Sequence, residues 1–260
     1  MSTKNVLLLT PQKELLQKAH DLKLEGVVNE LYEQFTNPEL FTDLSFEERV
    51  ERCLDEQSNV VAINKFNSLF KRSRLRHRRY IREFAPNPAR GLDANILLML
   101  KDCDYIRRGI NIVISGLTGT GKTALATATA TEAMSLGYSV MFYRMADLIA
   151  IIQSKDALGI SRFKERLRAI KLLIIDDYGL TKIPDQVVAC LNEIADSRYG
   201  VGSTLITTQL KKKSLISVID ESPIRDALAD RLFRDTDLEI TLKGNSWRGS
   251  VEELIGDCYQ

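Results

Sequence analysis

Residues 116–123, with the sequence Gly-Leu-Thr-Gly-Thr-Gly-Lys-Thr, have the residue types and spacing of a phosphate-binding loop. They follow a short apolar run at residues 110–114 and lead into a helical pattern, which is the context that such a loop requires. The glycines let the backbone wrap closely around an anion, and Lys122 brings a positive charge to β- and γ-phosphates. The Thr123 hydroxyl is placed to ligate Mg²⁺. The predicted ATP-binding residues are Gly116, Leu117, Thr118, Gly119, Thr120, Gly121, Lys122 and Thr123.

Two adjacent carboxylates end a second apolar run, the sequence Leu-Leu-Ile-Ile-Asp-Asp of residues 172–177. A nucleotide site needs such an acidic element beside the phosphates. Asp176 is the candidate for holding the hydration shell of Mg²⁺, and Asp177 is the candidate for polarising the attacking water. A turn cap ahead of Gly179 would explain one of the two acids, but not why the pair ends a buried strand. The sequence therefore predicts an ATP-hydrolysing site.

Two further polar residues are candidates for the same chemistry. Gln209 follows the apolar run of residues 203–208 and could sense the γ-phosphate or orient water, although a capping role at the end of a strand is the alternative. Arg231 and Arg234 lie near the polar side of a predicted helix. An arginine that reaches the γ-phosphate of a neighbouring subunit raises the rate by about 10³ to 10⁵. Such a role requires an oligomer, and a surface salt bridge is the alternative for each arginine.

The elements that position these residues alternate along the second half of the chain. Apolar runs predict five strands, at residues 109–115, 138–143, 172–176, 203–208 and 238–242. Helical patterns separate them, at residues 94–100, 122–135, 146–170, 184–199 and 223–233. Strands that alternate with helices indicate an α/β fold with a parallel sheet covered on both faces.

The first third of the chain has a different pattern. Leucines and aromatic residues recur at helical spacing from residue 11 to about residue 84, and Ser45 with Glu48 forms a capping pattern that predicts a helix from Phe46. Residues 85–91 contain two prolines and a glycine and are the predicted linker. We therefore expect a small all-helical domain for oligomerisation and DNA contact over residues 1–85, a linker over 86–92, an ATPase domain over 93–250 and a tail over 251–260.

Residues 65–82 are strongly basic, with almost no acid among them. One interpretation is a helix with a core-facing stripe and a solvated basic face, which is common for charge runs. The other is contact with a phosphate backbone, because unopposed arginines repel one another unless an anionic partner is present. Both interpretations stay open at this point. The candidate DNA-binding residues here are Arg72, Arg74, Arg76, Arg78 and Arg79.

Composition excludes several classes of protein. The 260 residues are 44% hydrophobic and 27% charged, as in ordinary soluble globular proteins. The four cysteines form no CxxC pair, and only two histidines are present, which argues against zinc sites, disulfide frameworks and serine–histidine catalysis. No uncharged apolar run approaches the roughly 20 residues of a membrane helix, and Pro11 interrupts the apolar start before it matches a signal peptide. We expect a cytoplasmic protein without membrane contact.

With these motifs in place, the chain resembles the IstB-like transposition helper ATPases, which are relatives of the DnaC-type helicase loaders within the AAA+ ATPases. The resemblance covers nearly the whole chain. The motifs that carry it are LKLEG from Leu22, LSFEER from Leu44, GLTGTGKTALA from Gly116, LLIIDDYG from Leu172, STLITTQL from Ser203, DALADRL from Asp226 and LKGNSWRG from Leu242.

The resemblance implies an AAA+ core without a carboxyl-terminal helical lid, with ATP and Mg²⁺ bound at the interfaces of a homo-oligomer. By the same resemblance Arg231 is the arginine finger in preference to Arg234, and Ala124 offers its backbone amide to the phosphates although many relatives have histidine there. Arg144 and Lys155, on the strand end and the helical region after it, become candidate DNA contacts. Arg248 is a possible substitute phosphate contact, with a surface role as the alternative.

The implied function is an ATPase, stimulated by double-stranded DNA, that assembles on DNA, selects a target and recruits or stimulates an integrase-type transposase. A DnaC-like helicase loader in DNA replication is the alternative, because it would share every motif of the core. A small-molecule kinase fits less well, because more than a hundred residues precede the phosphate-binding loop. A nucleotide-switched scaffold without turnover is a third possibility.

Overall fold

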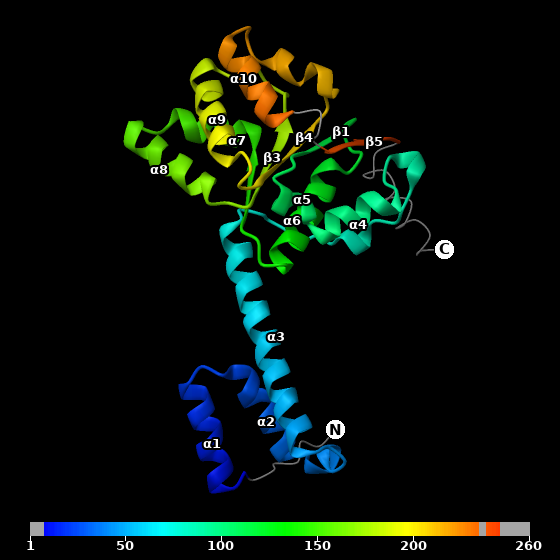
Figure 1. The fold of residues 1–260 in the computed structure, drawn as a ribbon, viewed down its shortest axis with the longest axis vertical. Coiled ribbons are helices and arrows are strands. Elements are labelled where there is room, and N and C mark those ends of the chain that lie inside the picture. The colour runs from blue at the N-terminus through cyan, green and yellow to red at the C-terminus, as the bar shows by residue number, and fades with distance from the viewer. Residues whose placement is uncertain (1–7, 234–237, 245–260) are drawn as a thin grey trace, which may run out of the picture. The chain divides into compact units, whose positions relative to one another are not determined.

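The computed structural model describes residues 8–233 and 238–244 (Figure 1). The chain divides into two compact units, Met1–Ser68 and Leu69–Gln260. No helix among the residues that the structure describes is both long and apolar enough to cross a membrane.

The first unit is all-helical, as predicted. It contains α1 (Thr10–Asp21), α2 (Glu25–Thr36), the short 3₁₀ helix η1 (Pro38–Phe41) and the first part of α3 (Phe46–Arg72). The capping pattern before α3 is present, because the Glu48 amide donates to Ser45 Oγ at 3.2 Å and the Ser45 amide donates to Glu48 Oε2 at 2.7 Å. The predicted start of this helix is therefore confirmed.

Helices α2 and α3 approach closely at Gly26. The Gly26 amide donates to Gln57 Oε1 at 2.9 Å, and a Cβ atom on Gly26 would lie 2.4 Å from the backbone of Gln57. A side chain at residue 26 would therefore separate the two helices. Helices α2 and α3 also contact each other two turns further along α2, where the side-chain Nε2 of the buried Gln34 donates to the carbonyl of Arg49.

The second unit begins with residues 69–92, which pack on its sheet and helices. The carbonyl of Ser73 accepts from the amide of Phe142 at 2.8 Å, and the amide of the buried Ile81 donates to Glu132 Oε1 at 3.3 Å. The helices η2 (Ile81–Glu83) and η3 (Pro88–Arg90) follow. The proline- and glycine-containing segment predicted as a linker thus lies inside the second unit, and the two units divide at residue 68, within α3.

Five parallel strands form the sheet of the second unit, as predicted (Figure 1). They are β1 (Ile112–Gly116), β2 (Val140–Arg144), β3 (Leu172–Tyr178), β4 (Ser203–Thr208) and β5 (Leu238–Leu242), in the order β2-β3-β4-β1-β5. Every residue of β4 is buried, and β1 and β3 are almost entirely buried, which is the pattern of a sheet covered on both faces.

Helices cover the two faces of this sheet (Figure 1). Successive residues of each strand point to opposite faces of the sheet. Val113 and Ile175 therefore pack in a hydrophobic cluster with residues of α7 to α10 on one face. Helix α6 packs on the opposite face. The helices are α4 (Ala94–Asp102), α5 (Asp104–Arg108), α6 (Lys122–Ser135), α7 (Met145–Gln153), α8 (Ala157–Arg168), α9 (Asp185–Arg198), η4 (Lys212–Val218) and α10 (Pro223–Leu232).

The single helical segment predicted at residues 146–170 consists of two helices, α7 and α8. The break occurs because the Asp156 side chain accepts from the Gly159 amide at 2.8 Å and so caps a new helix. Aspartate at this position favours an amino-terminal cap over continuation of the preceding helix.

We predict that Gly26→Ala destabilises the helical unit, because the added Cβ would overlap the backbone of Gln57. Overpacking of this kind costs about 1–3 kcal/mol. Chemical denaturation followed by circular dichroism measures the change in the free energy of unfolding. Asn29→Ala, an exposed position on the same helix, is the control. An equal effect of the two substitutions would contradict the close approach of α2 and α3.

Candidate functional site

The phosphate-binding loop connects the end of β1 to the start of α6. Gly119 and Gly121 have φ angles of 84° and 96°, which favour glycine, and Gly121 is the residue that precedes α6. The first amides of a helix have no carbonyl partner within the helix, so those of Lys122, Thr123 and Ala124 are available to an anion. The loop is therefore shaped by its glycines to present a row of backbone amides.

Lys122 is held inside the loop. Its side chain is 6% exposed, and Nζ donates to the carbonyls of Gly116 at 2.8 Å and Leu117 at 2.9 Å. Burial lowers the pKa of Lys122, while the charges of Asp177 and Asp176 act in the opposite direction. The Lys122 ammonium group thus interacts electrostatically with the carboxylates of Asp176 and Asp177. A bound phosphate would place a further negative charge beside it.

Asp176 lies at the centre of the site, with 1% of its surface exposed. Its Oδ1 atom accepts from Thr123 Oγ1 at 2.9 Å and from Thr207 Oγ1 at 2.5 Å. Burial raises the pKa of Asp176, the Thr207 hydrogen bond lowers it, and the neighbouring Asp177 raises it further. A positive partner would stabilise this buried carboxylate.

The oxygen atoms of Thr123 and Asp176 fit a magnesium ion. A hydroxyl and a carboxylate converge beside the loop, and Mg²⁺ in phosphate-transfer sites needs only one or two carboxylates because water and phosphate complete its shell. In the described part of the chain, no group of three or more His, Cys, Asp or Glu residues could hold a metal ion by itself. The fit is thus to an ion that binds together with a phosphate.

Asp177 lies in a β-bulge. Ile175 pairs with Ile206 and Tyr178 pairs with Thr208, so Asp176 and Asp177 together stand opposite the single residue between those partners on β4. Asp177 has a φ of 58°. Successive side chains of a regular strand point to opposite faces, and a bulge changes that direction. The bulge therefore allows both acids to lie near the loop, where their charges oppose the lowering of the Lys122 pKa by burial.

Gln209 reaches the phosphate-binding loop from the end of β4. Its Oε1 atom accepts from Thr118 Oγ1 at 3.0 Å. The structure thus brings five of the predicted site residues to the carboxyl ends of three strands. These are Lys122 and Thr123 after β1, Asp176 and Asp177 on β3, and Gln209 after β4.

Arg231 lies at the opposite end of the sheet. Its carbonyl accepts from the Asn111 side chain at 3.0 Å, and Asn111 immediately precedes β1, whereas the loop follows β1. The guanidinium donates from Nε to Asp196 Oδ1 at 2.7 Å and from Nη1 to the Ala227 carbonyl at 3.0 Å. Within one chain the structure therefore does not bring Arg231 to the phosphate-binding loop. Arg234 and Arg248 lie outside the described residues.

The arginines that follow α3 contact aromatic rings and one acid. The Arg74 guanidinium lies 4.7 Å from the centre of the Tyr143 ring, and that of Arg78 lies 4.8 Å from the centre of Phe70. Arg79 forms an ion pair with Glu83 at 3.1 Å. Such contacts orient the stems while exposed edges of the guanidinium groups stay in solvent. Arg72 is the last residue of α3, and Arg76 is exposed.

Two basic residues from the helical region after β2, Lys155 and Arg166, contact the aromatic pair Tyr143 and Phe163. Arg166 donates to the Tyr143 hydroxyl at 3.1 Å, and Lys155 Nζ lies 5.8 Å from the centre of the Phe163 ring. Arg144 ends β2, next to Tyr143, and is exposed.

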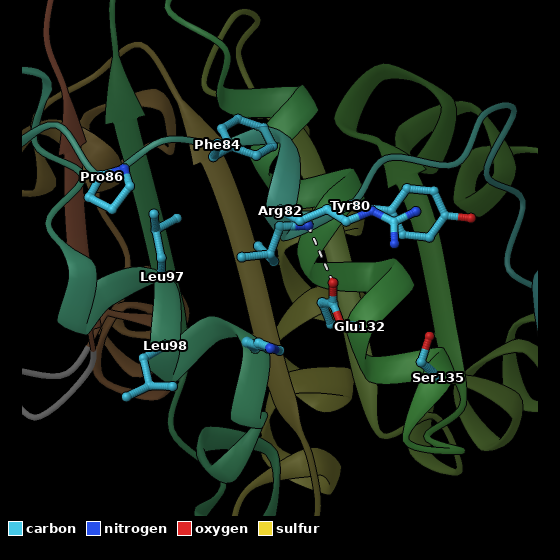
Figure 2. A pocket seen from close by; sticks show the side chains of 10 residues that line it. Tyr80, Arg82, Phe84, Pro86, Leu97, Leu98, Glu132 and Ser135 are labelled. Carbon is cyan, nitrogen blue, oxygen red and sulfur yellow. Dashed lines mark hydrogen bonds between the residues drawn. The ribbon is translucent and has the colours of Figure 1, made fainter.

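A cavity in the second unit is separate from the phosphate-binding loop. It has a volume of about 560 Å³ and lies between the segment of residues 80–86, α4 and α6 (Figure 2). Leu97 and Leu98 from α4 and Glu132 from α6 are among the residues that line it (Figure 2). None of the residues that line it belongs to the phosphate-binding loop. The phosphate-binding loop is instead marked by its backbone geometry, with Gly119 and Gly121 at positive φ directly before α6.

A family model described as IstB-like ATP binding protein matches residues 17–253. The chain belongs to this family. The ATP-binding protein of insertion sequence IS1162 from Pseudomonas fluorescens is 31% identical over 197 residues, which are 75% of this chain and 85% of that protein. The insertion sequence ATP-binding protein y4uH of Sinorhizobium fredii is 31% identical over 245 residues, which are 93% of this chain and 96% of that protein.

Solved structures share the fold of this IstB-like protein. The DnaC helicase loader matches with a TM-score of 0.50 at 20% identity, over 63% of this chain and 96% of DnaC. AMPPCP-bound DnaA from Aquifex aeolicus matches with a TM-score of 0.56 at 18% identity, over 71% of this chain and 57% of DnaA. At these identities the likeness shows the fold alone. The predicted α/β fold with a five-stranded parallel sheet and the predicted family are both confirmed.

We predict that Lys122→Ala lowers the affinity for ATP by roughly 10- to 100-fold, because hydrogen bonds to charged groups contribute about 1.5–3 kcal/mol. Titration with a fluorescent ATP analogue measures the dissociation constant. Lys101→Ala, an exposed lysine on α4, is the matched control. Wild-type affinity in the Lys122 variant would contradict the placement of the phosphates at this loop.

Proposed function

We propose that this IstB-like protein hydrolyses ATP with the residues that converge at the ends of β1, β3 and β4. The observation that carries the proposal is the contact between Thr123 on α6 and the buried Asp176 on β3, which joins the phosphate-binding loop to the acidic strand. The sequence motifs alone predict both halves, and the contact supports their action as one site.

Each residue has a defined part in this proposal. Lys122 and the loop amides hold the phosphates, and Thr123 with Asp176 holds Mg²⁺, which supplies positive charge to the phosphate oxygens when bound. Asp177 orients and polarises the attacking water. Gln209, beside Thr118, senses the γ-phosphate or orients water. Positioning and charge neutralisation account for most of the catalysis in phosphoryl transfer.

Arg231 acts on a nucleotide bound to another subunit. Arg231 lies at the amino ends of the strands, away from the phosphate-binding loop of its own chain. The hydrogen bond from the Asn111 side chain to the Arg231 carbonyl supports this placement, because Asn111 precedes β1 and the loop follows it. Its ion pair with Asp196 holds the guanidinium against α9. A contribution of about 10³ to 10⁵ in rate corresponds to roughly 4–7 kcal/mol of barrier. The functional form is then a homo-oligomer with ATP at its interfaces.

The second unit is the proposed site of contact with double-stranded DNA. Residues 69–260 contain 29 Lys and Arg against 23 Asp and Glu, a net charge of +6, whereas residues 1–68 contain 7 against 12, a net charge of −5. An acidic unit is repelled by a phosphate backbone, and a basic one is attracted to it. The contacting residues proposed are Arg72, Arg74, Arg76, Arg78, Arg79, Arg144 and Lys155.

An integrase-type transposase is the proposed protein partner. The relatives named above belong to insertion sequences, which supports a role beside a transposase in target selection. The fold shared with the DnaC helicase loader is the observation that favours a helicase as the alternative partner. ATP hydrolysis would then act as a timer or release step after assembly on DNA.

We predict that double-stranded DNA stimulates ATP hydrolysis and that Asp177→Asn lowers kcat by about 10²-fold or more, as loss of a general base does. ATP binding should change little, because Asp177 acts on water. Phosphate release with and without DNA measures turnover, and Asp185→Asn, an exposed acid on α9, is the control. A wild-type protein without turnover in the presence of DNA would instead support a nucleotide-switched scaffold.

We also predict that DNA binding weakens steeply with salt and that charge reversal at Arg72, Arg74, Arg76, Arg78 and Arg79 flattens this dependence. Each lost phosphate contact reduces the slope of log K against log salt by about 0.9. Fluorescence anisotropy over a salt series measures the slope. Reversal of Lys13, Lys18 and Lys23 in the acidic unit is the control. An unchanged slope in the arginine variant would assign these residues to a solvated face.

A further inference from the structure

Thr207 contacts both acidic residues of the nucleotide site. Its side chain is fully buried on β4, where its Oγ1 atom donates to Asp176 Oδ1 at 2.5 Å and accepts from the Asp177 amide at 3.0 Å. A hydroxyl has one proton to donate and two lone pairs that accept, so both bonds can exist together. One oxygen atom thus links the side chain of one acid to the backbone of the next.

The position of Thr207 in the sheet explains this double contact. It is the single β4 residue that stands opposite Asp176 and Asp177 in the bulge, between the pairs Ile175 with Ile206 and Tyr178 with Thr208. A bulge leaves one residue outside the regular ladder of backbone hydrogen bonds. The Thr207 hydroxyl supplies an acceptor to the Asp177 amide in place of a ladder carbonyl.

Asp177 needs such a restraint. Its φ of 58° lies in the left-handed region, which glycine adopts freely and aspartate adopts only occasionally, where surrounding contacts hold it. Asp176 has a related need, because a carboxylate buried to this extent must have its oxygens hydrogen-bonded. Thr207 and Thr123 approach the same Oδ1 atom from β4 and α6, respectively.

The neighbouring Thr208 offers an internal comparison. It is equally buried, and its Oγ1 atom also makes two hydrogen bonds, donating to the Tyr178 carbonyl at 2.8 Å and accepting from the Leu210 amide at 3.0 Å. Both partners are main-chain groups. The two threonines therefore match in burial and in number of hydrogen bonds, and they differ in whether a carboxylate is among the partners.

We propose that Thr207 is a positioning residue of the nucleotide site, which orients the Asp176 carboxylate toward Thr123 and holds Asp177 in the bulge. This inference rests on the proposed function, since it assigns a task to the same two acids. Its readout is the dependence of nucleotide binding on Mg²⁺. Residues that support a metal ligand typically contribute 10- to 100-fold to metal affinity or activity.

The test compares Thr207→Val, Thr207→Ser and Thr208→Val in the full-length protein. MgCl₂ titrations with a fluorescent ATP analogue give the Mg²⁺ concentration for half-maximal binding, and the same titration in EDTA gives metal-free affinity. We expect Thr207→Val to raise the half-maximal Mg²⁺ concentration about 10- to 100-fold with less than about a twofold change in EDTA. Thr207→Ser should restore it to within a few-fold of wild type.

The control separates positioning from general stability. Thr208→Val should lower the unfolding temperature about as much as Thr207→Val while leaving the Mg²⁺ dependence at the wild-type value. Equal Mg²⁺ shifts in the two valine variants, or no shift in Thr207→Val, would overturn the inference. If Thr207→Val does not fold, Thr207→Ala and Thr208→Ala replace the pair with the same expected difference.

The outcomes also distinguish this inference from the proposed function. A wild-type protein that binds nucleotide with Mg²⁺ but shows no turnover would refute hydrolysis, while a Mg²⁺ shift specific to Thr207→Val would still support positioning. Normal turnover in Thr207→Val with wild-type Mg²⁺ dependence would refute positioning and leave hydrolysis intact.

Discussion

The geometry of this site depends on the hydrogen bonds that the buried carboxylate of Asp176 accepts. A charge at that depth is costly unless its oxygens are hydrogen-bonded, and hydroxyls from Thr123 on α6 and Thr207 on β4 provide those bonds. These two hydrogen bonds thereby hold α6 and β4 to β3 at the carboxyl ends of the strands. Because burial still raises the pKa of Asp176, a cation beside it completes the arrangement, as Mg²⁺ held with a phosphate would.

The parallel sheet that places these residues together also keeps Arg231 away from them. Loops that follow parallel strands gather at one edge, and the contact of Arg231 with Asn111 lies at the other. Under the proposed function the active site is divided between two copies of the chain, and nucleotide binding and assembly would depend on each other. Residues 1–68 carry a net negative charge and residues 69–260 a net positive charge, which under the proposed function would direct DNA toward the second unit.

Local patterns were sufficient to predict the strands, the phosphate-binding loop and the carboxylate pair, because short apolar runs, glycine spacing and adjacent acids are visible in a few residues. Features that depend on distant pairing were not predictable. The bulge at Asp177 lies opposite Thr207, thirty positions away in the sequence, and the unit boundary at residue 68 depends on contacts such as that of Ser73 with Phe142. The capping aspartate at residue 156 was a local signal, yet the apolar pattern on both sides suggested one helix.

The division of the active site between subunits is tested most directly by mixing variants that are inactive alone. Lys122→Ala removes the phosphate-binding half of the site and Arg231→Ala removes the half supplied to a neighbour, so a mixed oligomer contains some interfaces with both halves intact. The account predicts that this mixture recovers part of the ATPase activity, whereas a mixture of Lys122→Ala and Asp177→Asn, which share one half, stays inactive. No recovery in the first mixture, with particles of wild-type size, would contradict it.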